Sequence, residues 1–513
     1  MAIHRTFEPD GLCRDYSLNA LELEPLPSLI FTSWVVESPV WRRIDTAGSD
    51  RADRPVAEVM GSRASPLPRP PLCAVRAGAT VAPPMQLRAP AGLRSLGRTL
   101  SRRNGRVFYA GSLLAWTGMW IQRIAVGWLA WELTTSPFWL GLVVFCDLAP
   151  AVVAAPIAGA VADRTDRVRL TMAAQSVTAL QSLTLGLLVL TNLITIELLL
   201  ALELVVGVSN SFTQPARQTL IPALVPREDL PAAVALNSLT FNVARFTGPA
   251  ISGAIIVWAG VAPAILVNCA SYLIASLSLL LLQIAPSERI GHAPTRSLRA
   301  ETLDGFRYAA RHRGIGPLLL FAALMGVFAR PFLELLPAFA DAVFQRGAPG
   351  LAMLASVTGA GALIAGTLLA ARGGTRGLTL IGIGAGFVMA IGGFLFVATS
   401  IFAIGLVGAA IAAAAQIVHG VAIQTLVQGA ADRAMRGRVL SLWGLIIRAC
   451  PAIGALGLGA LAEAIGLRLA VACASAFCLP VWWWGMRRQR RVAVVMERGI
   501  GPKPPPPAEK GGI

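Results

Sequence analysis

Ionisable side chains interrupt the long apolar segments of this chain, beginning with Arg123 and Asp147 in two neighbouring segments. They stand about ten and nine residues from the same predicted membrane surface, which places both roughly 14–15 Å deep. Charged groups at such depth are costly, so they pair with one another or serve a function. We therefore predict an Arg123–Asp147 ion pair, in which Asp147 either carries a coupling proton or is a static structural partner.

A later apolar segment holds Arg330 and Glu334, which are four residues apart. An α-helix would place both side chains on one face. Glu334 is therefore a second candidate for binding a proton or a cation. The alternative is an ion pair within that helix, near the outer membrane surface.

Two further arginines, Arg245 and Arg448, lie near the middle of their apolar segments. Each precedes a helix-distorting proline, Pro249 or Pro451. Gly248 and the other small residues of "GPAISG" allow close helix packing and a pivot. We favour a lock between two parts of the molecule as the role of these arginines, with binding of an anionic substrate as the alternative.

Composition excludes several classes of protein. The chain is 55% hydrophobic and 14% charged, whereas a soluble domain carries about 25% charged residues. Its net charge is +17, but without a basic stripe interleaved with aromatic residues nucleic-acid binding is not expected. Lys503 and Lys510 are the sequence's only lysines, so a phosphate-binding loop cannot form within the apolar region. No nucleophile–base motif or metal-ligand spacing occurs, and we expect neither an enzyme nor a cofactor or metal.

The elements that must position these residues are membrane helices, because the apolar segments reach the roughly 20 residues that a helix needs to cross a bilayer. We predict an all-α membrane protein with twelve spans at 107–133, 138–161, 169–191, 196–214, 232–258, 262–284, 315–341, 348–371, 377–398, 400–427, 437–463 and 467–486. They form two six-helix halves, 98–284 and 315–486, joined by a cytoplasmic loop at 285–314. A disordered extension at 1–97 and a disordered tail at 487–513 complete the predicted organisation.

Loop charge predicts the orientation. With both termini in the cytoplasm, the inside loops and tail hold twenty arginines and the outside loops hold only Arg346 and Arg468. The halves also look like a duplication. "QTLI" at 218–221 matches "QTLV" at 424–427, 206 residues on, and "ARFTGPAI" at 244–251 resembles "IRACPAIG" at 447–454. Transporters often have such halves and bind substrate between them.

The charged stretch "GAVADRTDRVRL" (159–170) falls between the second and third spans. Its pattern, with Gly159, Asp163, Arg164 and Arg167, resembles the loop signature of the major facilitator superfamily, although Asp166 replaces the usual glycine. The resemblance implies a latch that holds the cytoplasmic gate shut. In the alternative interpretation the stretch is an ordinary basic inside loop.

Longer segments resemble the enterobactin-exporter-like branch of that superfamily, the transmembrane secretion effectors. They are "FTQPARQTLIPALVPREDLPAAVALNSLTFNVARFTGPAISG", "WIQRIAVGWLAWELT", "LDGFRYAARH" and "MRGRVLSLWGLIIRACPAIGALGLGALAEAIG", and the likeness covers roughly 98–490. It implies efflux of siderophore-, drug- or metabolite-like small molecules, driven by proton antiport, from a monomer in the bacterial inner membrane. A nutrient importer and a non-transporting receptor or scaffold remain alternatives.

The first residues of the chain form a separate expectation. Residues 1–84 lack a periodic apolar pattern and are rich in proline and arginine, so they cannot bury enough surface to offset the entropy of ordering. We expect them to be dispensable, with Met85 a possible start of translation; a regulatory or partner-binding tail is the alternative.

Overall fold

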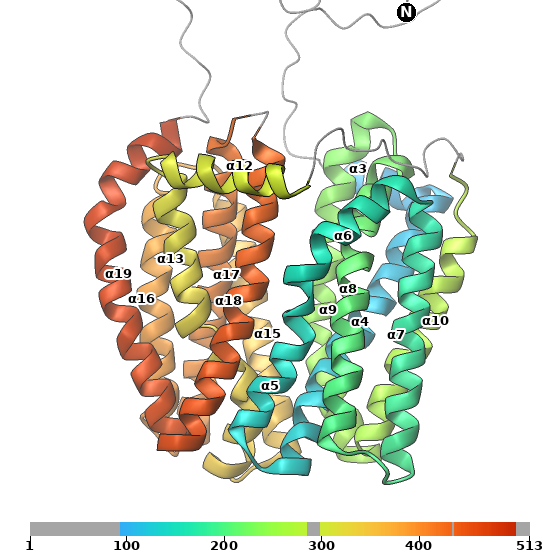
Figure 1. Cartoon of the computed structure of the whole chain (residues 1–513), viewed down its shortest axis with the longest axis vertical. Helices are drawn as coiled ribbons and strands as arrows, with labels where there is room; N and C mark the ends of the chain where they lie inside the picture. Colours follow the sequence, from blue (N-terminus) through green and yellow to red (C-terminus); the bar gives the residue numbers. More distant parts are fainter. Residues whose placement is uncertain (1–92, 285–297, 433–434, 499–513) are drawn as a thin grey trace, which may run out of the picture. The chain divides into compact units, whose positions relative to one another are not determined.

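A computed structural model describes residues 93–284, 298–432 and 435–498. Every regular element in these ranges is a helix (Figure 1). The first set comprises α3 (Leu93–Ser101), α4 (Arg103–Thr134), α5 (Pro137–Leu148), α6 (Pro150–Arg164), α7 (Arg167–Leu190), α8 (Ile196–Leu224), η1 (Arg227–Asp229), α9 (Leu230–Ala259) and α10 (Val261–Leu280). The second comprises α12 (Leu298–Arg311), α13 (Ile315–Phe328), η2 (Pro331–Leu335), α14 (Leu336–Ala338), η3 (Phe339–Val343), α15 (Gly347–Arg372), α16 (Leu378–Val397), α17 (Phe402–Ala430), α18 (Arg436–Ile465) and α19 (Leu467–Arg498).

Each of the twelve predicted spans contains helix. Among the described residues, ten helical segments are long and apolar enough to cross a membrane. The long helices α4 and α9 are not among the ten, since α4 carries Gln122 and Arg123 and α9 carries Asn237, Asn242 and Arg245. The protein is thus an all-helical, multi-pass membrane protein, while the count of twelve spans and the cytoplasmic termini stay predictions.

Prolines divide two of the predicted spans. The segment 138–161 consists of α5 and α6, and Pro150 begins the second helix, where its missing N–H costs no hydrogen bond. The segment 315–341 is α only as far as Phe328, and then becomes the 3₁₀ helix η2, the short α14 and the π-helix η3. Pro331 and Pro337 stand at the first two of these changes, so this segment cannot keep one helical period throughout.

Three boundaries differ from prediction. α12 occupies much of the segment predicted as a polar loop, and α3 begins inside the predicted extension. α19 continues past residue 486 as far as Arg498, because Val492 and Met496 are buried and the Glu497 carboxylate accepts hydrogen bonds from the first turn of α16. The segments 1–92, 285–297 and 499–513 lie outside the described residues.

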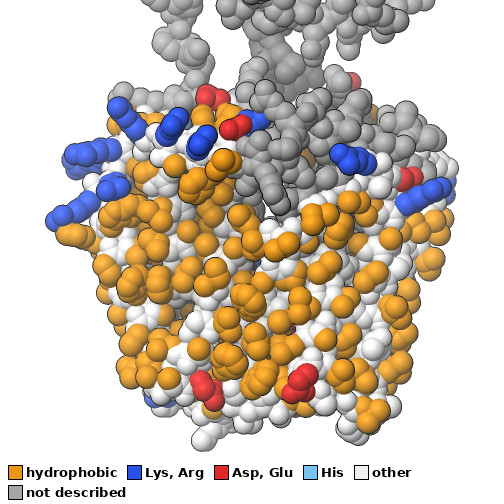
Figure 2. All heavy atoms as spheres, viewed as in Figure 1, with side chains coloured by type: hydrophobic (Ala, Val, Ile, Leu, Met, Phe, Trp, Pro, Cys, Tyr) orange, Lys and Arg blue, Asp and Glu red, His pale blue; other side chains and the backbone are white. Residues whose placement is uncertain are grey.

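The two ends of the helices differ in charge. Figure 2 shows basic side chains gathered at the end where α12 lies, above flanks covered by hydrophobic side chains. We call this the arginine-rich end, and the opposite one, where α4 ends and α5 begins, the distal end. At the arginine-rich end, the Nδ1 atom of His312 accepts hydrogen bonds from the backbone N–H groups of Gly314 and Ile315 and so caps α13. Burial lowers the pKa of His312, although the Asp432 charge opposes this effect.

Close helix packing joins the two halves toward the distal end. α5 packs against α18, and α9 packs against α15. A Cβ atom added at Gly141 would meet the backbone of Ala455, and one added at Gly459 would meet the backbone carbonyl of Pro137, 2.6 Å away. Small residues are therefore required here for the backbones to approach each other.

Three side-chain hydrogen bonds between described residues also join the halves. The Arg123 guanidinium donates to the Glu334 carboxylate, the Trp131 indole to Asp341 (2.9 Å), and the Ser136 hydroxyl to Glu463 (2.7 Å). All three begin in the part of α4 nearer the distal end or just after it. The described contacts thus hold the halves together at and near that end.

Candidate functional site

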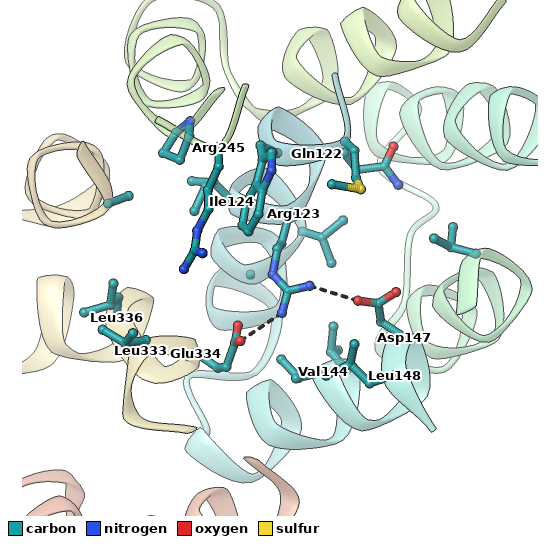
Figure 3. Close-up of a pocket in the computed structure, with 18 of the residues that line it drawn as sticks. Gln122, Arg123, Ile124, Val144, Asp147, Leu148, Arg245, Leu333, Glu334 and Leu336 are labelled. Atoms are coloured by element: carbon teal, nitrogen blue, oxygen red, sulfur yellow. Dashed lines mark hydrogen bonds and ion pairs between the residues drawn. The ribbon is translucent and has the colours of Figure 1, made fainter. Parts of the chain in front are cut away.

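Arg123 stands at the centre of a partly buried ion-pair triad. Its Nη1 lies 3.0 Å from Asp147 Oδ2 on α5, and its Nη2 lies 2.9 Å from Glu334 Oε1 on η2 (Figure 3). The exposed fractions of these side chains are 26% for Arg123, 18% for Asp147 and 15% for Glu334. The predicted Arg123–Asp147 contact is therefore confirmed. The guanidinium also binds a carboxylate from the other half of the molecule.

The alternative interpretation of Glu334, an ion pair with Arg330 within one helix, does not match the structure. Glu334 binds Arg123, whereas the guanidinium of Arg330 donates to the backbone carbonyl of Ile447 on α18 at 2.9 Å. Pro331 begins a 3₁₀ helix immediately after Arg330. With three residues per turn, positions i and i+4 no longer share a face, so Glu334 is free to turn toward α4.

A cavity of about 370 Å³ surrounds this triad. Helices of both halves line it, including α4, α5, α8 and α9 from the first half and α15, α17 and α18 from the second. Seven arginine and carboxyl side chains contribute to its wall: Arg123, Arg245, Arg330, Arg448, Asp147, Glu203 and Glu334. Four arginines against three carboxyls favour an anionic ligand in this space.

The paired arginines of the duplicated halves both reach the cavity. Arg245 on α9 points into the same space as the triad (Figure 3), and its guanidinium lies 5.6 Å from the centre of the Trp120 ring, a cation–π distance. Arg448 on α18 lines the cavity as well. The half-to-half lock was the favoured role for both, but this placement gives the anion-binding alternative equal support.

The glycine and prolines beside these arginines pack between helices. Gly248 lets α9 approach α4, where an added Cβ would clash with Trp120. Pro249 is buried and lines the cavity. Pro451 is buried in α18 opposite Gly326 of α13. These contacts fit the predicted close helix packing.

A polar network beside the triad was not predicted from the sequence. The Gln122 amide donates to the Gln181 amide oxygen at 3.0 Å, and the Gln122 oxygen accepts from Ser182 and from Asn268 at 2.6 Å each. These side chains come from α4, α7 and α10, and all of them are buried. Uncharged polar residues within apolar segments were the available signal, because in a membrane such groups bind one another or a substrate.

Glu203 on α8 was also missed. Its side chain is buried, with the residue 6% exposed, and it lines the cavity. Its Oε1 atom is buried with no hydrogen-bond partner in the described part of the chain. Glu203 lies inside the predicted fourth span, so it is an ionisable side chain within an apolar segment. The same feature identified Asp147 as a candidate and could have identified Glu203.

The loop signature lies at the arginine-rich end, where α6 ends and α7 begins. The side chains of Gly159 and Asp163 lie outside the described residues. Arg164 is exposed at the end of α6, and the Nη1 atom of Arg167 donates to the Thr219 carbonyl of α8 at 3.3 Å. Asp166, the residue that departs from the signature, caps α7 by accepting from the N–H groups of Val168 and Arg169. The latch thus stays a prediction.

Known proteins are similar to this chain in sequence and in fold. Residues 98–492 match the family model described as "transmembrane secretion effector". The enterobactin exporter EntS of Escherichia coli is 30% identical over 352 residues, which cover 68% of this chain and 82% of that protein. The staphyloferrin A transporter of Staphylococcus aureus is 30% identical over 152 residues, 29% of this chain and only 38% of that protein.

A solved structure with the same fold is a bacterial homolog of the human lysosomal transporter Spinster, in an inward-facing and unoccupied conformation. It has a TM-score of 0.58 at 16% identity and covers 80% of this chain and 99% of that chain. The family match shows a multi-pass transporter of the major facilitator type, and the solved structure shares its fold. The chain belongs to the transmembrane secretion effector family, within the enterobactin-exporter-like branch of that superfamily.

Proposed function

We propose that this protein is a proton-coupled secondary transporter that exports small anionic or amphipathic molecules across the cytoplasmic membrane by alternating access. The observation that carries the proposal is the ion-pair triad, in which Arg123 binds one carboxylate from each half inside the cavity. A proton that takes the place of Arg123 on a carboxylate, or an anionic substrate that takes the place of a carboxylate on Arg123, changes the bond between the halves. Binding in the cavity is thereby coupled to the movement of the halves.

The roles of the site residues follow from this arrangement. Asp147 and Glu334 are the proposed carboxylates of the coupling site, whose bonds to Arg123 respond to proton binding, and Arg123 is the cation that they share. Arg330 binds the α18 backbone and supports the coupling site from the second half. Arg245 and Arg448 contact the substrate or help to hold the halves, and the Gly248–Pro249 and Pro451 positions supply the pivots.

We propose a topology of twelve spans with both termini in the cytoplasm, in a monomer. Residues 98–284 and 315–486 are the two halves, and the arginine-rich end then faces the cytoplasm. Gly159, Asp163, Arg164 and Arg167 form the proposed cytoplasmic latch. With the distal end held by cross-half contacts, the described conformation corresponds to one closed toward the outside.

Relatives guide the choice of probe. Since one relative is an enterobactin exporter and another a staphyloferrin A transporter, enterobactin and staphyloferrin A are suitable probes for this protein. Both are tested in proteoliposomes that contain the purified full chain and carry an imposed pH gradient. Antiport accumulates the probe on the acidic side, as protons leave that side.

The control is the same preparation after an ionophore has collapsed the gradient. Accumulation on the alkaline side would indicate a nutrient importer instead. Absence of any probe-stimulated proton movement with either compound, together with tolerance of Asp147→Asn and Glu334→Gln, would favour a receptor or scaffold. Gradient-driven export by both of those variants would place proton coupling elsewhere.

A further inference from the structure

The buried carboxyl of Glu203 has no role in the ion-pair triad. The two terminal nitrogens of Arg123 bind Asp147 and Glu334, and Glu203 Oε1 has no hydrogen-bond partner in the described part of the chain. At 6% exposure, water reaches this side chain poorly. Such a group requires an explanation, because an unpaired charge buried in this way is strongly unfavourable.

Helix packing brings Glu203 close to Asp147. Gly207 lies one turn further along α8, so the two residues share a face of that helix. A Cβ atom added at Gly207 would clash with the backbone carbonyl oxygens of Asp147 and Cys146. α8 therefore lies directly against the part of α5 that carries Asp147. The ionisable groups that face Glu203 are Asp147 and Cys146 from α5 and Arg123 from α4.

Charge balance decides which carboxyl holds a proton. Two carboxyls that share a buried site cannot both be ionised at low cost, and the proton resides on the one with fewer stabilising partners. Asp147 accepts a charge-assisted hydrogen bond of 3.0 Å from Arg123, which favours its ionised form. Glu203 Oε1 accepts no hydrogen bond from any described residue.

We propose that Glu203 is the residue that carries the exchanged proton, while Asp147 remains the carboxylate that holds Arg123 in place. This inference rests on the proposed proton-coupled function and names the group that performs it. The proton binds Glu203 from one side of the membrane and leaves to water on the other. Only an O–H bond forms and breaks, and one proton per cycle passes through this residue.

Infrared spectroscopy tests the assignment without a transported substrate. The purified full chain in lipid is titrated while the carbonyl stretching band of protonated carboxylic acids is recorded. We expect a band in the unmodified protein that is lost in Glu203→Gln, shifted in Glu203→Asp and retained in Asp147→Asn. Glu197→Gln is the matched control, because Glu197 stands exposed in the first turn of the same helix.

Transport gives the second measurement. With enterobactin as the probe, Glu203→Gln should lose gradient-driven accumulation but retain exchange of probe across the membrane without a gradient. Glu203→Asp should keep both activities. The inference is overturned if the band survives in Glu203→Gln, or if this variant still accumulates enterobactin with the gradient. An unmodified protein that shows the Glu203 band but no gradient-driven transport would instead refute the proposed function.

Discussion

The Arg123–Glu334 bond should set the balance between conformations, and Glu334→Gln tests this directly. The bond spans 2.9 Å between side chains that are 26% and 15% exposed. The ion pair joins two charged groups and stands at the upper end of the range for hydrogen bonds to charged groups, about 3 kcal/mol, whereas the amide still accepts from the charged guanidinium and keeps about 1.5–2 kcal/mol. The substitution therefore removes about 1–1.5 kcal/mol from the state with the distal end closed. Its population relative to the open state should fall about 5- to 12-fold.

Asp147→Asn is the matched control, since Asp147 binds the same guanidinium at 3.0 Å with 18% exposure but belongs to the same half as Arg123. Spin labels are placed at positions 193 and 401, which are both exposed at the distal end. Double electron–electron resonance then measures the distance between the labels and so reports the opening of that end. Longer distances should gain population in Glu334→Gln and not in Asp147→Asn. Unchanged distances in Glu334→Gln, or an equal shift in both variants, would refute the reasoning.

Three other perturbations are predicted, two from described contacts and one from the proposed latch. Burial lowers the pKa of His312, and the neutral ring of His312 caps α13. The cap should therefore be intact above the ordinary histidine pKa and weaken as the pH falls through the lowered pKa of His312. Amide exchange at the start of α13 should show this pH dependence, and His312→Asn should abolish it. Gly459→Ala should open the distal end, measured by cysteine labelling, whereas Gly457→Ala on the same helix has open space for its Cβ and should not. Asp163→Asn should abolish transport at normal expression and raise cysteine labelling at the arginine-rich end. Asp166→Asn should leave transport nearly unchanged, because asparagine and aspartate cap a helix about equally well. Full transport by Asp163→Asn would contradict the latch.

Depth along a helix made the Arg123–Asp147 contact predictable. A regular rise per residue converts sequence position into depth, and two opposite charges at one depth on neighbouring helices have few other partners. The partner of Glu334 was not predictable in this way. Its prediction assumed an α-helix through Pro331, and the change to 3₁₀ geometry there rotates every later side chain.

Arg217 shows a second limit of sequence patterns. It is one of the twenty arginines predicted to lie in the inside loops and tail. In the structure it lies inside α8, is 6% exposed, and its guanidinium lies 4.4 Å from the centre of the Trp116 ring. An aromatic face can hold an arginine without any carboxylate, so charge alone does not end a helix. Tertiary packing decided this boundary, and no local signal revealed it.

The amphipathic helix α12 could have been found. Leu303 and Phe306 are three residues apart, exposed and apolar, among the arginines of that segment. This spacing is typical of a helix lying at a membrane surface. The segment was predicted as a loop because it lacks an apolar run long enough to cross a membrane.

The Glu497 cap determines where foreign sequence can be joined to this protein. Its carboxylate accepts hydrogen bonds from the N–H groups of Gly377 (2.7 Å) and Thr379 (3.0 Å), and so fastens the last turn of α19 to the start of α16. An affinity tag or fluorescent fusion that replaced residues from 487 onward would remove this fastening and leave the first turn of α16 without an anion at its positive end. A fusion attached after Arg498 preserves it, so the two designs should differ in yield of folded protein.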